Sequence, residues 1–294
     1  MRAITITDMS RLEQTIKDNR LVAVKYYQDN PCLLRIKVDY PKQETVVEFS
    51  GKILYRDYPL LISANTIKEC FRHIEELGFC KIDDCLMMQS EVVACDVTKD
   101  IHYDIGAVQS YIRGHLSNYN RFLCRVLRNG NVIIENNVTT RKYKKRMTIY
   151  DKWQEMQKAD NQKYMQKYGL TDEFYGKCRF ECNLNSKERI RDALNIEDNH
   201  IMSVLLADTN PITDFLDEAL QRGENKECSD WKAYQRFLVL QDCGFDLAQV
   251  ERKIRSLYRR GTNIAQVMQP YRDAYQKLST ERNDIIPTLK SLLN

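Results

Sequence analysis

The chain has 294 residues, 43% of them hydrophobic, which is enough for one large domain or two modest ones with a buried core. Its 45 basic and 41 acidic residues leave a formal charge of only +4, so affinity for nucleic acid requires local clusters of cations. No Gly-rich phosphate loop, membrane-spanning apolar run or signal peptide is found in the sequence, which argues against an ATPase and predicts a cytoplasmic protein without membrane contacts.

The cysteines and histidines predict neither a disulfide framework nor a zinc site. The ten cysteines are scattered along the chain, and several, such as Cys70 and Cys178, lie inside apolar patterns where a free thiol behaves as a small core side chain. Cys80 and Cys85 have no matching second pair, and the four histidines show no ligand spacing. We therefore expect reduced cysteines.

The first part of the chain has the pattern of strands followed by a clear helix. Three runs rich in β-branched and aromatic residues predict strands. They cover residues 21–27, 33–38 and 45–49. Asn65 is then placed to cap a helix whose apolar residues recur at helical spacing from Ile67 to Leu77. Gly78 follows at the position where helices commonly end in a left-handed residue.

More strands are expected before and after the midpoint of the chain. Residues 92–97 and 147–150 are predicted strands, and Asn129-Gly130 is expected to turn a hairpin. A helix is expected around residues 105–118. In residues 178–184 the even positions are apolar and the odd ones polar, which predicts an antiparallel strand with one buried face and one face free for polar side chains.

From about Ser186 onward the pattern changes to helices. One is expected to begin at Ser229, and Asp246 is placed to cap the next. The predicted fold class is α+β, with an antiparallel sheet and flanking helices followed by an all-helical C-terminal region. We place the domain boundary at this change, with a β-rich domain over residues 1–185 and a helical region over residues 186–294.

A dense cationic run lies between the predicted strands. Five of the six residues from position 141 to 146 are cationic, and the sixth is a tyrosine. Such a run has to face solvent or a polyanion, so a solvated hairpin tip and a DNA-contacting segment both fit it. The candidate DNA-binding residues are Arg141, Lys142, Tyr143, Lys144, Lys145 and Arg146.

A tyrosine and a lysine follow this run at strand spacing. If the strand continues, Thr148, Tyr150 and Lys152 project from one face. A nearby ammonium and a bound metal ion can stabilise a phenolate and polarise the phosphate that it attacks. Tyr150 and Lys152 are therefore candidate catalytic residues. The structural alternative is a core tyrosine at the end of a strand, followed by an amphipathic helix.

Four acids in or next to predicted strands are candidate ligands for Mg²⁺ or Mn²⁺, which prefer oxygen donors. They are Glu48, Asp96, Asp100 and Glu181. An acid is disfavoured in a strand unless it is exposed, paired or a ligand, so several in one sheet indicate a shared polar surface. Arg179 lies near Glu181 on the polar face of its strand, and an ordinary salt bridge between these two is an equally good interpretation.

Taken in order, these segments resemble the gene II type replication initiators of filamentous phages and the rolling-circle initiators of small plasmids. Each of five blocks is similar to one motif of the family, such as its Ile-Tyr-Asn-Lys segment with a later Gln-Glu, its Arg-Phe-Glu strand and its helical tail. The blocks are residues 47–54, 93–100, 149–155, 178–184 and 231–250. Together they span roughly residues 45–255.

The resemblance implies a nicking enzyme with a palm-like antiparallel sheet. In the phage branch, the position of Tyr150 is that of the nucleophile, which cuts one DNA strand and stays linked to it as a phosphotyrosine. The chain lacks the His-x-His pair of the wider nickase superfamily, so the resemblance to the plasmid branch implies that carboxylates hold the metal ion. In that branch the nucleophile comes several residues earlier, and Tyr143 is then the substitute candidate.

The expected activity is metal-dependent DNA nicking and joining that starts rolling-circle replication of a phage or plasmid. The expected partners are the DNA of the replication origin, a host polymerase and a host helicase. The helical tail is a candidate for origin recognition, for the helicase contact or for a homodimer. Two alternatives stay open: a relative that binds DNA without cutting it, and a mobilisation relaxase that uses the same chemistry for transfer.

Overall fold

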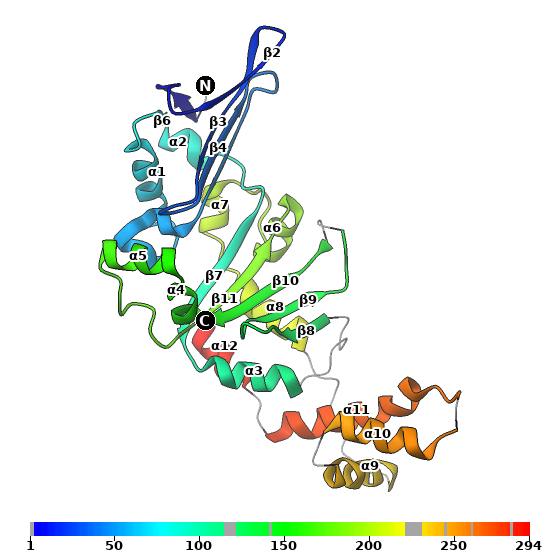
Figure 1. Ribbon diagram of the computed structural model, residues 1–294. Coiled ribbons are helices and arrows are strands. Elements are labelled where there is room, and N and C mark those ends of the chain that lie inside the picture. The colour runs from blue at the N-terminus through cyan, green and yellow to red at the C-terminus, as the bar shows by residue number, and fades with distance from the viewer. Residues whose placement is uncertain are drawn as a thin grey trace. The chain divides into compact units, whose positions relative to one another are not determined.

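A computed structural model describes residues 3–114, 122–140, 143–220, 231–243, 246–259, 261–282 and 285–294 (Figure 1). The chain forms two compact units, each assembled from separate segments. The first unit comprises residues 1–103, 140–143 and 151–211, and the second comprises residues 104–139, 144–150 and 212–294. The compositional change near residue 186 lies within the first unit.

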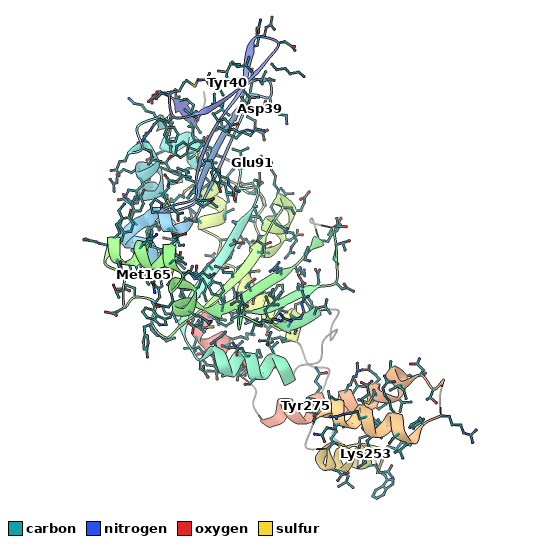
Figure 2. The ribbon with its side chains drawn as sticks, in the orientation of Figure 1. Asp39, Tyr40, Glu91, Met165, Lys253 and Tyr275 are labelled. Atoms are coloured by element: carbon teal, nitrogen blue, oxygen red, sulfur yellow. The ribbon has the colours of Figure 1, made fainter. Side chains whose placement is uncertain are left out.

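The largest sheet of the first unit has four antiparallel strands in the order β2-β3-β4-β5. They are β2 (Glu13–Lys17), β3 (Arg20–Gln28), β4 (Leu34–Asp39) and β5 (Glu44–Phe49). The three strands expected in this region are therefore confirmed. Asp18 and Asn19 both have a positive φ, as the two-residue turn between β2 and β3 requires. Tyr40 follows Asp39 at the end of β4 (Figure 2). Its N–H donates to the carbonyl of Val22 at 3.0 Å.

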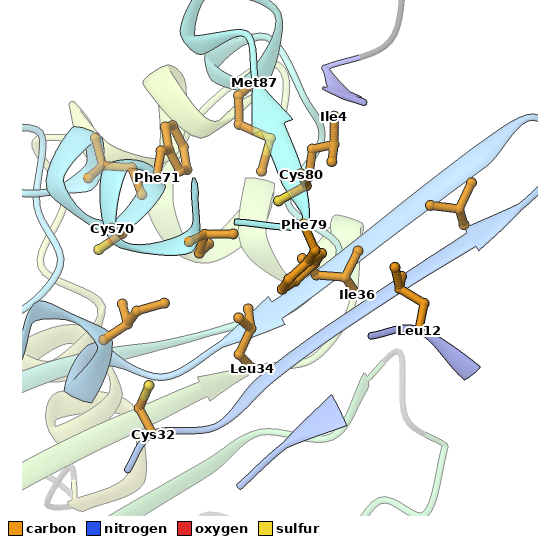
Figure 3. Close-up of a cluster of buried hydrophobic side chains, with 14 of the residues drawn as sticks. Ile4, Leu12, Cys32, Leu34, Ile36, Cys70, Phe71, Phe79, Cys80 and Met87 are labelled. Carbon is orange, nitrogen blue, oxygen red and sulfur yellow. The ribbon is translucent and has the colours of Figure 1, made fainter. Parts of the chain in front are cut away.

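One face of this sheet forms a hydrophobic core with a helix. Leu34 and Ile36 of β4 are buried against Phe71 of α1 (Ile67–Glu75) and against Phe79, which follows that helix (Figure 3). Burying a large apolar side chain contributes about 1.5–3 kcal/mol, so these residues supply much of the stability of this part. The opposite face of the sheet carries polar and charged side chains.

The helix expected after Asn65 is confirmed, with a one-residue change at its start. Thr66 occupies the N-cap position, and its hydroxyl accepts from the N–H of Ser63 at 2.8 Å. Gly78 has a φ of 84°, as expected for a residue that ends a helix in the left-handed region.

A second, aromatic core lies between three short helices of the first unit. They are η1 (Gly51–Leu60), α4 (Lys152–Met156) and α5 (Ala159–Tyr168). Tyr58, Tyr164 and Phe174 are buried together with Met165, and the Tyr164 hydroxyl donates to the carbonyl of Lys52 at 2.7 Å. This core joins segments more than a hundred residues apart in the sequence.

The first unit also contains a long antiparallel pair of strands. β7 (Cys95–His102) pairs antiparallel with β11 (Lys177–Leu184) along the full length of both strands. β7 starts three residues later than expected and extends to His102, so Asp100 lies inside the strand rather than after it. The remaining elements of this unit are β1 (Ile4–Ile6), β6 (Cys80–Ile82), α2 (Asp84–Met88), α6 (Lys187–Leu194) and α7 (Ile201–Leu205).

The second unit combines an antiparallel meander with helices. The meander consists of β8 (Phe122–Val126), β9 (Val132–Asn136) and β10 (Arg146–Asp151). The helices are α3 (Ile105–Gly114), α8 (Pro211–Leu220), α9 (Trp231–Asp242), α10 (Leu247–Leu257), α11 (Ile264–Arg282) and α12 (Ile286–Leu293). Leu240, Val250, Ile254 and Met268 form a core shared by α9, α10 and α11. The α+β class with a helical C-terminal region is thus confirmed.

No described helix combines the length and the apolar character that crossing a membrane requires. The nine cysteines among the described residues are free thiols. Cys70 and Cys178 are buried, and burial raises the pKa of the Cys70 thiol to about 12.

Candidate functional site

Tyr150 lies on the partly exposed face of β10. Met147 and Ile149 of this strand are fully buried, whereas Thr148 and Tyr150 are half-buried. Because side chains alternate along a strand, Tyr150 and Thr148 share the face opposite to the core. The tyrosine is therefore not one of the strand's core residues.

The strand ends at Asp151, one residue after Tyr150. Asp151 is the N-cap of α4, and its carboxylate accepts from the N–H of Gln154 at 3.0 Å. Lys152 is therefore the first residue of a helix, not the next outward residue of a strand. The expectation that strand alternation places Lys152 beside Tyr150 is wrong, because an aspartate before an amphipathic segment is a strong helix-start residue.

Lys152 lies instead in a buried polar cluster of the first unit. Its side chain is 2% exposed, and its ammonium donates to Glu155 Oε2 at 2.6 Å. The other oxygen of Glu155 accepts from the amide of Asn161 at 2.6 Å, and the Asn161 carbonyl oxygen accepts from Lys52 at 2.6 Å. The Lys152 ammonium also lies 5.2 Å from the centre of the Tyr58 ring. We call Lys152, Glu155, Asn161 and Lys52 the Lys152 cluster.

The Lys152 cluster makes stability depend on pH. Burial acts to raise the pKa of Glu155, but Lys152, Lys52 and Asn161 outweigh it, and the pKa lies below its ordinary value of 4.5. A carboxyl with a lowered folded-state pKa stabilises the fold above its unfolded value, and that contribution is lost as pH falls through the folded value. We expect acid unfolding titrations of Glu155→Gln to show a shallower loss of stability below about pH 4.5 than wild type. The same loss of stability with falling pH in Glu155→Gln and in wild type would contradict this role of Glu155.

The acids predicted as metal ligands are partly brought together on the β7–β11 ladder. Asp96 is opposite Asn183, Thr98 is opposite Glu181, and Asp100 is opposite Arg179. Residues directly opposite each other in an antiparallel pair, and residues two apart along a strand, project from the same face. Asp96, Asp100 and Glu181 therefore share one polar face, although 81 residues separate Asp100 from Glu181 in the sequence.

Asp100 is held by a buried arginine rather than left open to a cation. Arg179 donates to the two carboxylate oxygens of Asp100 at 2.6 and 2.7 Å, and to the Tyr58 hydroxyl at 2.9 Å. The side chains of Arg179 and Asp100 are 5% and 8% exposed. The expectation that the polar face of this strand is free is therefore wrong at Arg179. This bidentate pair favours a structural role for Asp100.

Asp96 and Glu181 are better suited to share an ion. They occupy diagonal positions of the ladder, about 7–8 Å apart at Cα, a distance that two carboxylate side chains can bridge through one cation. Asp96 and Asp100 are four residues apart on one strand, about 13 Å, which is too far. Asn183 donates to Asp96 Oδ1 at 2.5 Å and so orients that carboxylate.

The fourth predicted ligand lies in a different sheet. Glu48 is on β5, where its carboxylate accepts from Arg35 at 3.1 Å. Within the described parts of the chain, no group of three or more histidine, cysteine, aspartate or glutamate side chains is arranged to hold a metal ion. The donor set of Asp96 and Glu181 therefore fits only an ion that keeps several of its waters, as Mg²⁺ commonly does.

The cationic run divides into paired and exposed residues. Lys144 pairs with Glu135 at 3.1 Å, and Lys145 pairs with Glu218 of α8 at 2.5 Å. Tyr143 is 59% exposed, and Arg146 is exposed at the start of β10. Arg141 and Lys142 lie outside the described residues. The sequence does not indicate Glu135 as a partner, because an acid at the end of the apolar Val-Ile-Ile run has the pattern of a solvated strand end.

The comparisons with known proteins give no relative. No protein-family model matches the chain, and neither the curated proteins nor the solved structures contain a match.

Proposed function

We propose that the chain is a cytoplasmic DNA-nicking replication initiator of the rolling-circle type, with Tyr150 as the nucleophile. The supporting observation is the pairing of β7 with β11. These strands carry two of the blocks that resemble the initiator family, and their register places Asp96 and Glu181 on one face. A third block provides Tyr150 on the outward side of β10. Each of these three strands has an antiparallel partner within its own unit, which is the type of secondary structure that a nicking palm requires.

In the proposed reaction, the Tyr150 oxygen attacks the phosphorus of one phosphodiester in the origin. The bond between phosphorus and the 3′ oxygen breaks, the 5′ phosphate remains on the tyrosine, and the 3′ oxygen takes a proton to become a hydroxyl that a host polymerase extends. The exposed Tyr143 and Arg146 contact the DNA near the cut. Lys144 and Lys145, which pair with glutamates, add positive charge beside these two residues, and Arg141 and Lys142 are proposed to contact DNA from outside the described residues.

Asp96 and Glu181 are the residues that would hold Mg²⁺ or Mn²⁺. When bound, the ion would neutralise negative charge on the scissile phosphate. Asn183 keeps the Asp96 carboxylate oriented through its 2.5 Å hydrogen bond. Lys152 acts as a positioning residue in this scheme, because its contact with Glu155 fixes the first turn of α4, directly after the nucleophile's strand.

The metal assignment gives a direct prediction. Asp96→Asn and Glu181→Gln should each lower the rate of nicking of an origin-bearing supercoiled plasmid in Mg²⁺ by about 100-fold or more. Asp172→Asn and Glu173→Gln alter exposed acids of the same unit and should nick at the wild-type rate. Addition of EDTA should stop nicking by wild type. Wild-type nicking rates in both Asp96→Asn and Glu181→Gln would show that these two acids do not hold the metal ion.

A relative that binds DNA without cutting it is the second candidate. The bidentate contact of Arg179 with Asp100 favours this candidate, because it occupies both carboxylate oxygens of one of the four predicted metal ligands. DNA binding that persists in EDTA, with no covalent adduct in any divalent metal, would select this candidate. A mobilisation relaxase would form the same adduct as an initiator, and only the genes beside the coding sequence would separate the two.

A further inference from the structure

The outward face of the four-stranded sheet carries cations and an exposed aromatic ring that the nicking scheme does not use. In the register of β3 and β4, Lys25 is directly opposite Lys37, and Tyr27 is directly opposite Arg35. These four side chains therefore share one face. Val24 and Ile36, which alternate with them, are buried on the other face. The outward face is thus built from the two central strands of the sheet.

The charges on this face are unevenly distributed between the central and edge strands. Like charges opposite each other, as at Lys25 and Lys37, destabilise a sheet unless an anion or solvent separates them. Acids lie on the same face, and they pair with Arg35 and Lys37. These acids are Glu48 and Asp39. Two further acids lie on the outer strands, with Glu13 of β2 directly opposite Lys25 and Glu44 of β5 directly opposite Asp39.

The other cations of this face lack such partners. Among the described residues, Lys17, Arg20 and Lys25 have no carboxylate within the 4.0 Å of an ion pair. Lys17 and Arg20 are opposite each other at the tip of the hairpin β2–β3, which extends past α1 and α2 (Figure 1). By contrast, Lys144 and Lys145 of the cationic run are both held by glutamates. Lys17, Arg20 and Lys25 are therefore more available to bind a polyanion than Lys144 and Lys145.

Tyr27 gives the face a surface on which a base can stack. Its side chain is 57% exposed, although it lies in the middle of a sheet and not in a loop. The Arg35 guanidinium carbon lies 5.0 Å from the ring centre, and the Tyr27 hydroxyl donates to Asp29. The ring is thus oriented from two sides while most of its area stays open to solvent.

We propose that this face binds single-stranded DNA, with an unpaired base on Tyr27 and the backbone phosphates along Lys25, Lys37 and the hairpin tip. A four-stranded antiparallel sheet with exposed aromatic rings flanked by cations is an established platform for single strands. A duplex fits less well, because its bases are already stacked on each other. The inference rests on the proposed function for the source of its ligand, since nicking and strand displacement release a single strand.

The test uses the full chain, EDTA and a labelled oligothymidylate of about 20 nucleotides, with affinity measured by fluorescence anisotropy. Tyr27→Leu should weaken binding by about fivefold or more, since stacking on one ring is worth about 1–3 kcal/mol. Tyr175→Leu removes a tyrosine that is 70% exposed elsewhere in the same unit and should leave binding unchanged. Lys25→Gln/Lys37→Gln should reduce the salt slope of log K by about 1.4, whereas Lys68→Gln/Lys81→Gln should not.

The outcomes separate this proposal from the nicking proposal. Wild-type affinity in Tyr27→Leu and in the Lys25/Lys37 double variant would overturn the platform, even if Tyr150 forms its adduct. Loss of binding in both, without any adduct in the wild type, would support the platform and overturn nicking. Tighter binding of a blunt duplex than of the oligothymidylate would also overturn the single-strand assignment. Far-ultraviolet circular dichroism checks that each variant is folded.

Discussion

Replacing Arg179 by methionine should lower the free energy of unfolding of the first unit by about 3–5 kcal/mol. The methionine fills most of the arginine's volume, but it leaves the Asp100 carboxylate buried without its two donors and the Tyr58 hydroxyl without the Arg179 N–H. An uncompensated buried charge is among the few causes of destabilisation this large. The double variant Arg179→Met/Asp100→Leu removes both charges and should recover most of the lost stability.

The measurement is urea unfolding followed by the fluorescence of Trp153. This residue packs against Tyr175 within the first unit, and replacing the exposed Trp231 by phenylalanine leaves Trp153 as the chain's single tryptophan. Arg35→Met is the matched control, because its pair with Glu48 is about half exposed and should be worth less than about 1 kcal/mol. Equal effects of Arg179→Met and Arg35→Met would contradict a buried structural role for Arg179.

Replacing Tyr150 by phenylalanine should abolish the covalent DNA adduct, with nicking reduced by at least about 10³-fold. The substitution removes only the phenolic oxygen that forms the bond to phosphorus, and the half-buried ring can stay in place. Binding of origin DNA should be unchanged, because the cations and Tyr143 are intact. Nicking and adduct formation are measured together on a supercoiled origin plasmid in Mg²⁺.

Tyr143→Phe is the matched control for this variant. Tyr143 is 59% exposed and is the other tyrosine that the initiator resemblance allows as nucleophile. We expect Tyr143→Phe to form the adduct and to lose at most some affinity for DNA. The reverse result, an adduct in Tyr150→Phe but none in Tyr143→Phe, would move the nucleophile to the cationic run.

Local patterns in the sequence predicted the strands and the helices well where burial follows a simple period. Residues 178–184 alternate strictly, and Cys178, Phe180, Cys182 and Leu184 are all buried as the pattern requires. Asp246 was expected to cap a helix, and its carboxylate accepts from the N–H of Ala248 at 2.8 Å. In such segments, neighbouring residues alone decide the conformation.

The errors occurred where the decisive partner is distant in sequence. Arg179 has the pattern of an exposed strand residue, and only the pairing of β11 with β7 brings Asp100 to it from 79 residues away. The ion pair of Lys145 with Glu218 has the same cause, with 73 residues between the partners. Lys152 is a different case. Its burial could have been suspected from Asp151, a good N-cap residue, and from Glu155 one helical turn later.

The separation of the predicted acids follows from strand geometry. Glu48, Asp96, Asp100 and Glu181 look equivalent in a sequence, since each is an acid in or beside a strand. The register places both Asp96 and Asp100 diagonal to Glu181, but Asp100 accepts from Arg179, and Glu48 lies in another sheet. Side-chain spacing within a strand cannot give this result without knowledge of which strands pair.

Peptide mapping by mass spectrometry determines which residue, if any, becomes covalently linked to DNA. The wild-type chain is incubated with origin DNA and Mg²⁺, the DNA is digested with nuclease, and the proteolytic peptides are sequenced in the spectrometer. We expect a nucleotide attached through its 5′ phosphate to Tyr150. A nucleotide on Tyr143 or on any other residue, or no modified peptide in Mg²⁺ or Mn²⁺, would contradict it.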